Sequence, residues 1–220
     1  MRKTAIIVAG GQGIRMQGTL PKQFLAICGE PVLFHTLRKF NHDSIRIILV
    51  MNEAWIDYWN DLIREFEFEV QHEVVAGGRS RAMSVLNGLN LTDDNSLVAV
   101  HDAVRPLVSE TLIQELYNQA LQHKAVIPIV PVKDSLRIID GNTSKAVARE
   151  NFRAVQTPQV FLASLLKESF KMEGYENYTD EASLVEASGH PIHLVNGEES
   201  NIKITVPADL VFAEAMLMKR

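Results

Sequence analysis

The stretch TAIIVAGGQGIRMQGTLPKQ, residues 4–23, points to the fold of the whole chain. It opens with a short apolar run, 4–9, whose branched side chains are typical of a buried strand. Glycines at positions 10, 11 and 13 follow at once, and they let the backbone come close to a ligand. Arg15 and Lys22 stand on the same loop, and Pro21 precedes the lysine. Successive backbone N–H groups in such a turn form an anion site, so the loop is suited to holding a polyphosphate.

Two common phosphate-binding motifs do not fit this loop. The dinucleotide motif G-x-G-x-x-G would need a third glycine where Met16 stands. The P-loop would need Lys and Ser or Thr after Gly18, where Thr19 and Leu20 stand instead. The pattern G-G-x-G-x-R-M followed by P-K-Q is a different one. An ordinary glycine-rich turn is the alternative, but both cations lie on one short loop, which favours phosphate binding.

Strands and helices alternate along the rest of the chain, which predicts an α/β fold with a mostly parallel sheet and helices on both faces. The predicted strands after the first are 45–51, 73–76, 97–100, 125–132, 154–161, 192–195 and 201–205. The predicted helices are 32–40, 53–66, 79–89, 110–122, 162–171, 180–187 and 208–218. Such sheets bind ligands beyond the carboxyl ends of their strands. No repeat or second domain is evident, so we expect one domain over 1–220.

One segment, 133–152, breaks the alternation because it is polar and carries the turn signal Asp140-Gly141-Asn142. Its flanks, 135–139 and 146–149, are predicted to pair as a β-hairpin. A hairpin inserted between core strands has little of its own to bury. We therefore expect it to project as an arm and to pack against a second copy of the chain.

Composition excludes several classes of protein. The chain is 46% hydrophobic and 22% charged, as in soluble globular proteins, and its net charge of −5 argues against nucleic-acid binding. No apolar run approaches the length of a membrane span. The N-terminal apolar run is too short for a secretory signal. Cys28 is the only cysteine, so no internal disulfide can form, and we expect a cytoplasmic protein.

The stretch GGRSRAMS, residues 77–84, combines a glycine turn with the start of a helix. Such a turn can hold the edges of a base and a ribose. Gly-Gly turns are common, however, and Arg79 and Arg81 could simply be solvated.

The stretch HDAVRP, residues 101–106, places a carboxylate and a guanidinium at the end of a strand. Asp102 could hold a divalent metal beside phosphates, and Arg105 could grip a phosphate with two donors. The alternative is a structural Asp–Arg pair. Thr157 follows a strand and could donate its hydroxyl to a phosphate. Lys203 lies between two isoleucines, and we expect it to face the pocket.

Together these motifs closely resemble the 2-C-methyl-D-erythritol 4-phosphate cytidylyltransferases. VAGGQGIRM with PKQ, GGRSRAMSV, VHDAVRP, RAVQTPQ, YTDEASLVE and NIKIT stand in that family's order and approximate spacing, over nearly the whole chain. The resemblance implies a three-layer Rossmann-like nucleotidyltransferase fold with a protruding hairpin arm that forms a homodimer. The ribitol 5-phosphate cytidylyltransferases share much of the pattern and remain an alternative.

The resemblance also implies roles for individual residues. The expected catalytic residues are Arg15, Lys22 and Lys203. The expected nucleotide-binding residues are Ala9, Gly10, Gly11, Gly13, Gly77, Gly78, Arg81, Ser84 and Asp102. The expected residues for the phosphopolyol are Asp102, Arg105, Ser135, Arg149 and Thr157, with Ser135 and Arg149 reaching the partner's site. Serine at 135 departs from a familiar form of the motif, in which threonine stands, but it keeps the hydroxyl.

The chemistry expected from these residues is transfer of CMP from CTP to a phosphorylated polyol. A phosphate monoester is mostly dianionic at pH 7, because its second pKa is about 6, so it can attack without a general base. Catalysis then rests on positioning and on cations, with Mg²⁺ or another divalent cation on the triphosphate, held in part by Asp102. A non-catalytic nucleotide-binding module is the rival, but it would not need Lys22, Arg105 and Lys203 together.

Overall fold

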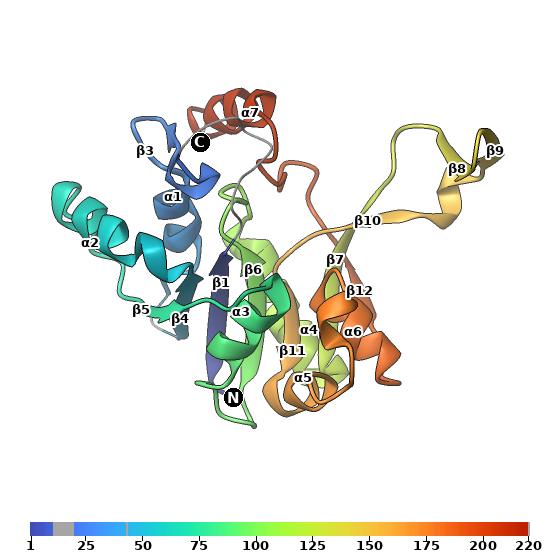
Figure 1. The fold of residues 1–220 in the computed structure, drawn as a ribbon, viewed down its shortest axis with the longest axis horizontal. Coiled ribbons are helices and arrows are strands. Elements are labelled where there is room, and N and C mark those ends of the chain that lie inside the picture. The colour runs from blue at the N-terminus through green and yellow to red at the C-terminus, as the bar shows by residue number, and fades with distance from the viewer. Residues whose placement is uncertain (11–19, 43, 220) are drawn as a thin grey trace.

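The computed structural model describes residues 1–10, 20–42 and 44–219. Its main sheet follows the order β10-β7-β11-β6-β1-β4-β5, with β12 also paired to β7 (Figure 1). Those strands are β1 Lys3–Ala9, β4 Ile45–Met51, β5 Glu73–Ala76, β6 Leu97–Asp102, β7 Ala125–Pro131, β10 Arg153–Val155, β11 Gln159–Leu162 and β12 His193–Asn196. Two small sheets pair β2 Ala26–Ile27 with β3 Glu30–Pro31 and β8 Leu136–Asp140 with β9 Thr143–Val147.

Helices cover both faces of the main sheet, and α3, α5 and α6 lie in front of it in Figure 1. The α-helices are α1 Val32–Lys39, α2 Ile56–Glu65, α3 Arg81–Leu89, α4 Glu110–His123, α5 Ala163–Ser169, α6 Glu181–Ala187 and α7 Pro207–Leu217. Short 3₁₀ helices are η2 Lys22–Phe24, η3 Glu53–Trp55, η4 Arg149–Asn151 and η5 Tyr175–Asn177. Among the described residues no helix is long and apolar enough to cross a membrane.

The apolar run of β1 shows why this architecture forms. Because side chains alternate along a strand, Ile7 packs with α1, α2 and α4 on one face, while Ile6 packs with α3, α5 and α6 on the other. Both side chains are fully buried. A strand covered on both faces is expected to be apolar throughout, and β1 pairs in parallel with β4 and β6. The predicted α/β fold with a mostly parallel sheet is therefore confirmed.

Two predicted strands are wrong. Residues 154–161 form two strands, β10 and β11, because Pro158 before β11 has no N–H to give to a ladder. Both strands run antiparallel to their neighbours. Residues 201–205 form no strand; there the N–H of Ile204 donates to the carbonyl of Val104, 2.9 Å away, so this segment is tied to a loop.

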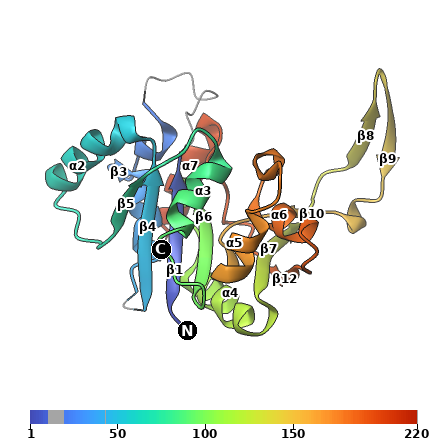
Figure 2. The same ribbon diagram turned by 60° about the horizontal axis from the view of Figure 1, so that its bottom comes forward.

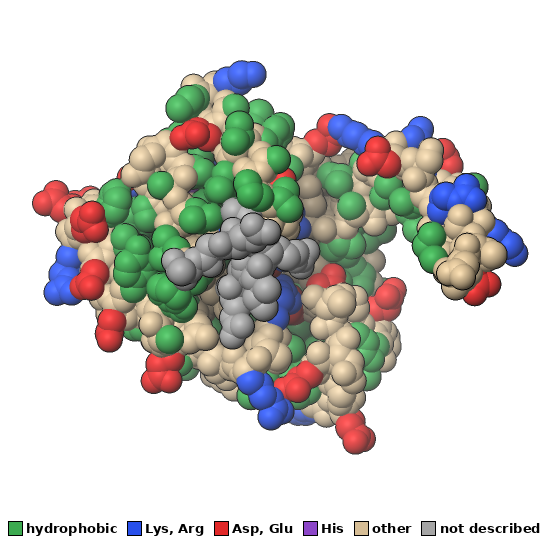
Figure 3. All heavy atoms as spheres, turned by 45° about the horizontal axis from the view of Figure 1, so that its top comes forward, with side chains coloured by type: hydrophobic (Ala, Val, Ile, Leu, Met, Phe, Trp, Pro, Cys, Tyr) green, Lys and Arg blue, Asp and Glu red, His purple; other side chains and the backbone are tan. Residues whose placement is uncertain are grey.

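The predicted hairpin forms, with β8 and β9 paired antiparallel from Leu136↔Val147 to Asp140↔Thr143. The arm extends away from the body in both ribbon views (Figures 1 and 2). A deep notch separates the arm from the body in Figure 3, and the arm carries both positively and negatively charged side chains. Ile138 and Ile139 are exposed on it, at 58% and 70%.

Candidate active site

The site residues gather at the carboxyl ends of β1, β5 and β6, as the rule for open α/β sheets predicts. Ala9 ends β1 and Gly10 follows it. Gly11, Gly13 and Arg15 lie outside the described residues. Lys22 begins η2, which is tied to β1 because the Gln23 side chain donates to the Ala9 carbonyl, 3.0 Å away. Lys22 therefore stands near the end of β1.

Lys22 also lies within electrostatic reach of helix α7. Burial by itself raises the pKa of Asp209 at the start of this helix. Hydrogen bonds from Val206 and Thr205, together with the positive charge of Lys22, outweigh burial and lower that pKa below its usual range. The η2 turn and the start of α7 are thus neighbours.

Gly77 and Gly78 follow β5, and the first turns of α3 leave no room for a side chain at either position. A Cβ on Gly77 would lie 2.9 Å from the Ser84 hydroxyl oxygen, and a Cβ on Gly78 would lie 2.4 Å from the Cβ of Met83. A Cβ on Gly10 would lie 3.3 Å from the same Ser84 oxygen. Gly10 and Gly77 therefore both lie against one serine.

Ser84 itself is 1% exposed, and its hydroxyl is engaged with backbone groups. It donates to the carbonyl of Ser80 at 2.9 Å and accepts the N–H of Gly78 at 3.1 Å. The expected contact of Ser84 with a nucleotide is therefore not through a free hydroxyl. Its position makes it a support for Gly10 and for the turn at Gly77 and Gly78.

Asp102, at the end of β6, is the centre of the site. Its Oδ2 lies 3.1 Å from Nζ of Lys203 and 3.2 Å from Nε of Arg105, and its Oδ1 lies 3.7 Å from Nε of Arg81. The three cations come from three separate segments of the chain. Burial by itself raises the pKa of Asp102, but Lys203, Arg81 and Arg105 outweigh it and hold the pKa well below its usual range.

The loop that carries Asp102 and Arg105 is held by buried groups. His101 is fully buried, which lowers its pKa to about 4, so the ring is neutral at neutral pH. Its Nε2 lies 3.2 Å from the Arg105 carbonyl, which can only accept, so Nε2 carries the proton. Nδ1 then accepts the Thr157 hydroxyl at 3.1 Å. The same hydroxyl oxygen accepts the Asp102 N–H at 3.1 Å.

Thr157 requires a correction. The sequence predicts that its hydroxyl donates to a phosphate, but the residue is 5% exposed and the hydroxyl is engaged on both sides. Thr157 therefore positions Asp102 and is not free to bind a ligand through this group. His101 takes part in the same chain of hydrogen bonds, so its role is structural.

Arg81 is the first residue of α3, because the Ser80 side chain caps that helix by accepting the Met83 N–H. Its guanidinium donates to both carboxylate oxygens of Glu181, at 2.6 and 3.0 Å. Burial lowers the pKa of Arg81, but Glu181 and Asp102 outweigh this and raise it. Arg81, expected to bind nucleotide, is therefore already engaged with two carboxylates.

Sequence reasoning missed Glu181 and Asn201. Glu181 stands in the first turn of α6, where an acidic residue is ordinary, and its only signal was its place in the YTDEASLVE motif. Asn201 is fully buried, its amide donates to the Thr157 carbonyl at 2.9 Å, and its own carbonyl accepts from Arg105 at 2.8 Å. Its place beside Lys203 in the NIKIT motif was the one available signal.

Ser135 and Arg149 lie at the base of the arm. The Arg149 guanidinium donates to the carbonyl of Lys133 and lies 3.7 Å from Glu150. The hydrogen bonds and ion pairs of Asp102 within the described part of the chain involve neither Ser135 nor Arg149. The two arm residues and the centre of the site are therefore not brought together in one subunit.

Comparison with known proteins points to one family. Residues 3–219 match the family model described as 2-C-methyl-D-erythritol 4-phosphate cytidylyltransferase. The protein of that name from Bacteroides thetaiotaomicron is 48% identical over 219 residues, covering 99% of this chain and 100% of the relative. One from Geobacillus kaustophilus is 40% identical, covering 100% and 99%. The crystal structure of one from Thermus thermophilus aligns with a TM-score of 0.82 at 32% identity, covering 99% and 100%. The chain belongs to the 2-C-methyl-D-erythritol 4-phosphate cytidylyltransferase family.

Proposed function

We propose that this chain transfers CMP from CTP to 2-C-methyl-D-erythritol 4-phosphate and releases pyrophosphate, in isoprenoid biosynthesis. The observation that carries the proposal is the convergence of Arg81, Arg105 and Lys203 on the buried carboxylate of Asp102 in a chain that aligns end to end with that family. The product is 4-diphosphocytidyl-2-C-methyl-D-erythritol. The catalytic unit is one domain over 1–220 that carries the arm, and we assign it to the cytoplasm.

The residues of this chain act by position and charge. The acceptor phosphate is mostly dianionic at pH 7, so it needs no general base to attack the α-phosphate of CTP. The obstacle is repulsion between two polyanions. Lys203 and Arg105 receive the acceptor phosphate, and the first glycine loop with Lys22 and Arg15 receives the triphosphate. The turn at Gly77 and Gly78 holds the base and ribose. Because Arg105 and Lys203 are paired with Asp102 before reaction, charge that develops beside them in the transition state is stabilised with little reorganisation.

A divalent cation, Mg²⁺ in the first instance, is the cofactor we propose. The described residues contain no group of three or more potential ligands. Asp102 nevertheless fits such an ion, because Mg²⁺ is commonly held by one or two carboxylates together with substrate phosphates. When bound, the ion neutralises charge on the triphosphate. Asp102 is kept ionised by its cations, as a ligand must be.

We also propose that the active enzyme is a homodimer in which the arm completes the partner's site. Arg149, Lys133 and Arg153 line a concavity of about 410 Å³ at the base of the arm, with Glu150 as the acidic lining residue. This surplus of positive charge is suited to an anion. Exposed apolar side chains on and beside the arm, including Ile138, Ile139, Phe152 and Val155, support packing against a second copy. Nucleic acid and membranes are not among the proposed partners.

A substrate panel tests the function. Methylerythritol phosphate and ribitol 5-phosphate are each offered with CTP, UTP, ATP and GTP in the presence of Mg²⁺, and pyrophosphate release is measured. We expect CTP with methylerythritol phosphate to exceed every other pair by at least about two orders of magnitude, since unpaired buried polar groups reject wrong substrates strongly. Faster turnover of ribitol 5-phosphate would move the chain to the sister activity. If no pair of substrates released pyrophosphate, the chain would be a nucleotide-binding module without catalytic activity.

A further inference from the structure

Glu181 is a carboxylate that the reaction described above does not use, although it is 2% exposed and lies in the site. Burial of a carboxylate is costly unless it is paired. Glu181 is paired with Arg81 through two hydrogen bonds, 2.6 and 3.0 Å long. Because Arg81 also faces Asp102, Glu181 belongs to the same charged cluster, with Arg81 between the two carboxylates.

Arg81 lies between two carboxylates that hold it unequally. Its two terminal nitrogens donate to Glu181, while its Nε faces Asp102 at 3.7 Å, which is beyond hydrogen-bond distance. The forked geometry toward Glu181 is the stronger interaction. Glu181 thus holds the guanidinium back from Asp102.

The neighbouring carboxylate cannot replace Glu181. Asp180 accepts the Ser183 N–H at the start of α6 with one oxygen and the Gln159 amide, 2.9 Å away, with the other. Its oxygens are therefore engaged in fixing the helix. Among the described residues, Glu181 and Asp102 are the two carboxylates that form ion pairs with Arg81.

The balance of charge at Asp102 depends on this pairing. Asp102 carries one negative charge and faces Lys203, Arg105 and Arg81. If all three cations were uncompensated, a further cation would be repelled from the carboxylate. Glu181 neutralises one of the three. At the low effective dielectric of a buried site, one unit of charge changes ion affinity substantially.

We infer that Glu181 is a positioning residue that neutralises Arg81 and thereby weakens the repulsion that a divalent cation beside CTP meets at Asp102. This inference rests on the proposed function, because it takes CTP and a divalent cation as ligands of the site. The inference predicts that loss of the Glu181 charge changes the affinities for free CTP and for the divalent cation in opposite directions. Loss of the Glu181 charge makes the site more positive, which favours the free nucleotide and disfavours the metal.

The test uses isothermal titration calorimetry of CTP into the enzyme, with and without Mn²⁺. The quantity compared is the factor by which Mn²⁺ tightens CTP binding. In Glu181→Gln, CTP without metal should bind as tightly as to the wild type or more tightly, while the Mn²⁺ factor should fall about tenfold. General damage to the site would instead weaken CTP in both conditions, and that result would overturn the inference.

A second variant tests whether Glu181 acts through Arg81. In Arg81→Gln/Glu181→Gln, both charges are gone, and the Mn²⁺ factor should return to within about threefold of the wild type. The matched control is Glu73→Gln, which removes a carboxylate from another two-pronged pair, with Arg46, at 2.6 and 2.7 Å. That control should leave the Mn²⁺ factor unchanged.

Other outcomes decide between the two proposals. If Glu181→Gln does not fold, Glu181→Asp replaces it; the shorter carboxylate cannot keep both bonds, and the Mn²⁺ factor should fall about threefold. An unchanged factor in the variant that folds, or no return in the double variant, would overturn the inference. Failure of the wild type to turn over CTP with methylerythritol phosphate would instead overturn the proposed function.

Discussion

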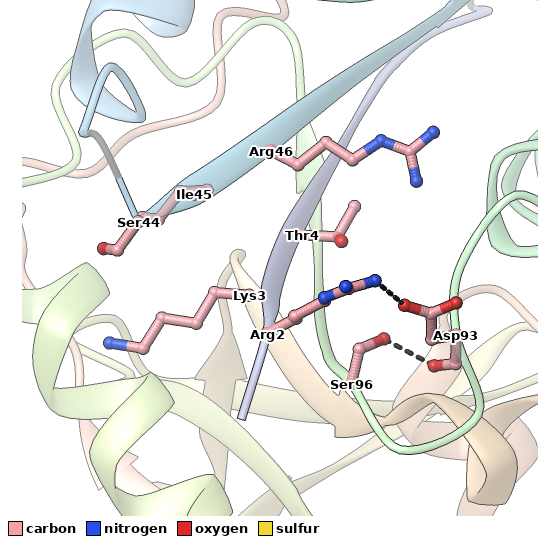
Figure 4. Close-up of a pocket in the computed structure, with 8 residues that line it drawn as sticks. All are labelled: Arg2, Lys3, Thr4, Ser44, Ile45, Arg46, Asp93 and Ser96. Carbon is pink, nitrogen blue, oxygen red and sulfur yellow. Dashed lines mark hydrogen bonds and ion pairs between the residues drawn. The ribbon is translucent and has the colours of Figure 1, made fainter.

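The two ends of the main sheet both gather charged side chains, and they differ in how those charges are held. At the amino end, a pocket of about 300 Å³ is lined by Arg2, Lys3, Arg46 and Asp93 (Figure 4). Lys3 and Arg46 point in opposite directions there. At the carboxyl end, Arg81, Arg105 and Lys203 converge on Asp102.

Burial of the carboxylate at the centre of each cluster separates the two ends. The Arg2–Asp93 pair is 2.7 Å long, but its side chains are 84% and 64% exposed. The Asp102 side chain is 9% exposed, and that of Arg105 is 11%. Exposed charges are screened by water and salt, whereas buried charges act on each other and on a ligand at lower dielectric. A pocket that contains cations is therefore not yet a site; the cations must be fixed around one point from which water is largely excluded.

The largest expected effect contrasts one lysine from each end. Lys203→Ala should lower kcat by roughly 10²–10³, because a fixed cation that stabilises transition-state charge is lost. Lys3→Ala is the control; Lys3 lies over the Tyr117 ring, 5.2 Å from its centroid, and kcat should stay within about twofold of the wild type. Steady-state kinetics at saturating CTP measure both. If both variants lost kcat equally, the two ends of the sheet would not differ in their contribution to catalysis.

The next prediction asks whether the carboxyl end takes a further cation from a second subunit. Lys22→Ala and Arg149→Ala should each be nearly inactive. After mixing under conditions that exchange subunits, a heterodimer has one site with its own Lys22 and an intact Arg149 from the other chain. About a quarter of all sites should then be active in an equal mixture. If Arg149 serves its own subunit, heterodimers form but activity does not return.

A smaller effect is expected for the residue that positions Asp102. Thr157→Val leaves the Asp102 N–H and His101 Nδ1 without their partner, which should cost about 1–3 kcal/mol of unfolding free energy and about tenfold in kcat. Thr92→Val is the matched control at the opposite end. Thr92 is 6% exposed and donates to the Leu89 carbonyl, so its loss should lower stability alone. Denaturant unfolding and kinetics give the two numbers, and a wild-type kcat in Thr157→Val would contradict the role.

The smallest effect concerns the exposed pair at the amino end. Arg46→Gln should lower the unfolding free energy by at most about 1 kcal/mol, because the partner Glu73 is 52% exposed and the Arg46 side chain 42%. Turnover should be unchanged. Urea unfolding at low and high salt checks this, and the difference from the wild type should shrink as salt rises. A loss of several kcal/mol would show that this end is held as tightly as the other.

The general architecture could be predicted from the sequence, because periodicity reports burial. The first strand is predicted at 4–9 and is Lys3–Ala9, and the arm is predicted from its polarity and its turn. The direction and division of strands between 153 and 162 could not be predicted, since branched residues show that a strand is buried but not which neighbour it pairs with.

The site could be predicted in part for a similar reason. Asp102, Arg105 and Lys203 are expected in the site, and the structure brings them together. The direction of the Thr157 hydroxyl depends on a fully buried histidine 56 positions away in the chain, which no local pattern reports. Glu181 lies in the YTDEASLVE motif, but an acidic residue in a first helical turn does not show that it pairs with Arg81, 100 positions away.

The arm leaves the sheet and returns to it at one point, because Pro131 of β7 faces Arg153 of β10 across the ladder. The intervening residues, 132–152, therefore form an insertion whose two ends are neighbours in the sheet. Exchanging them for a short turn would preserve strand order, since the entropy of closing a loop changes only slowly with its length. In evolutionary terms the length and surface of this segment can diverge without rebuilding the strands that hold Asp102, and in the proposed dimer such divergence would alter the contact between subunits.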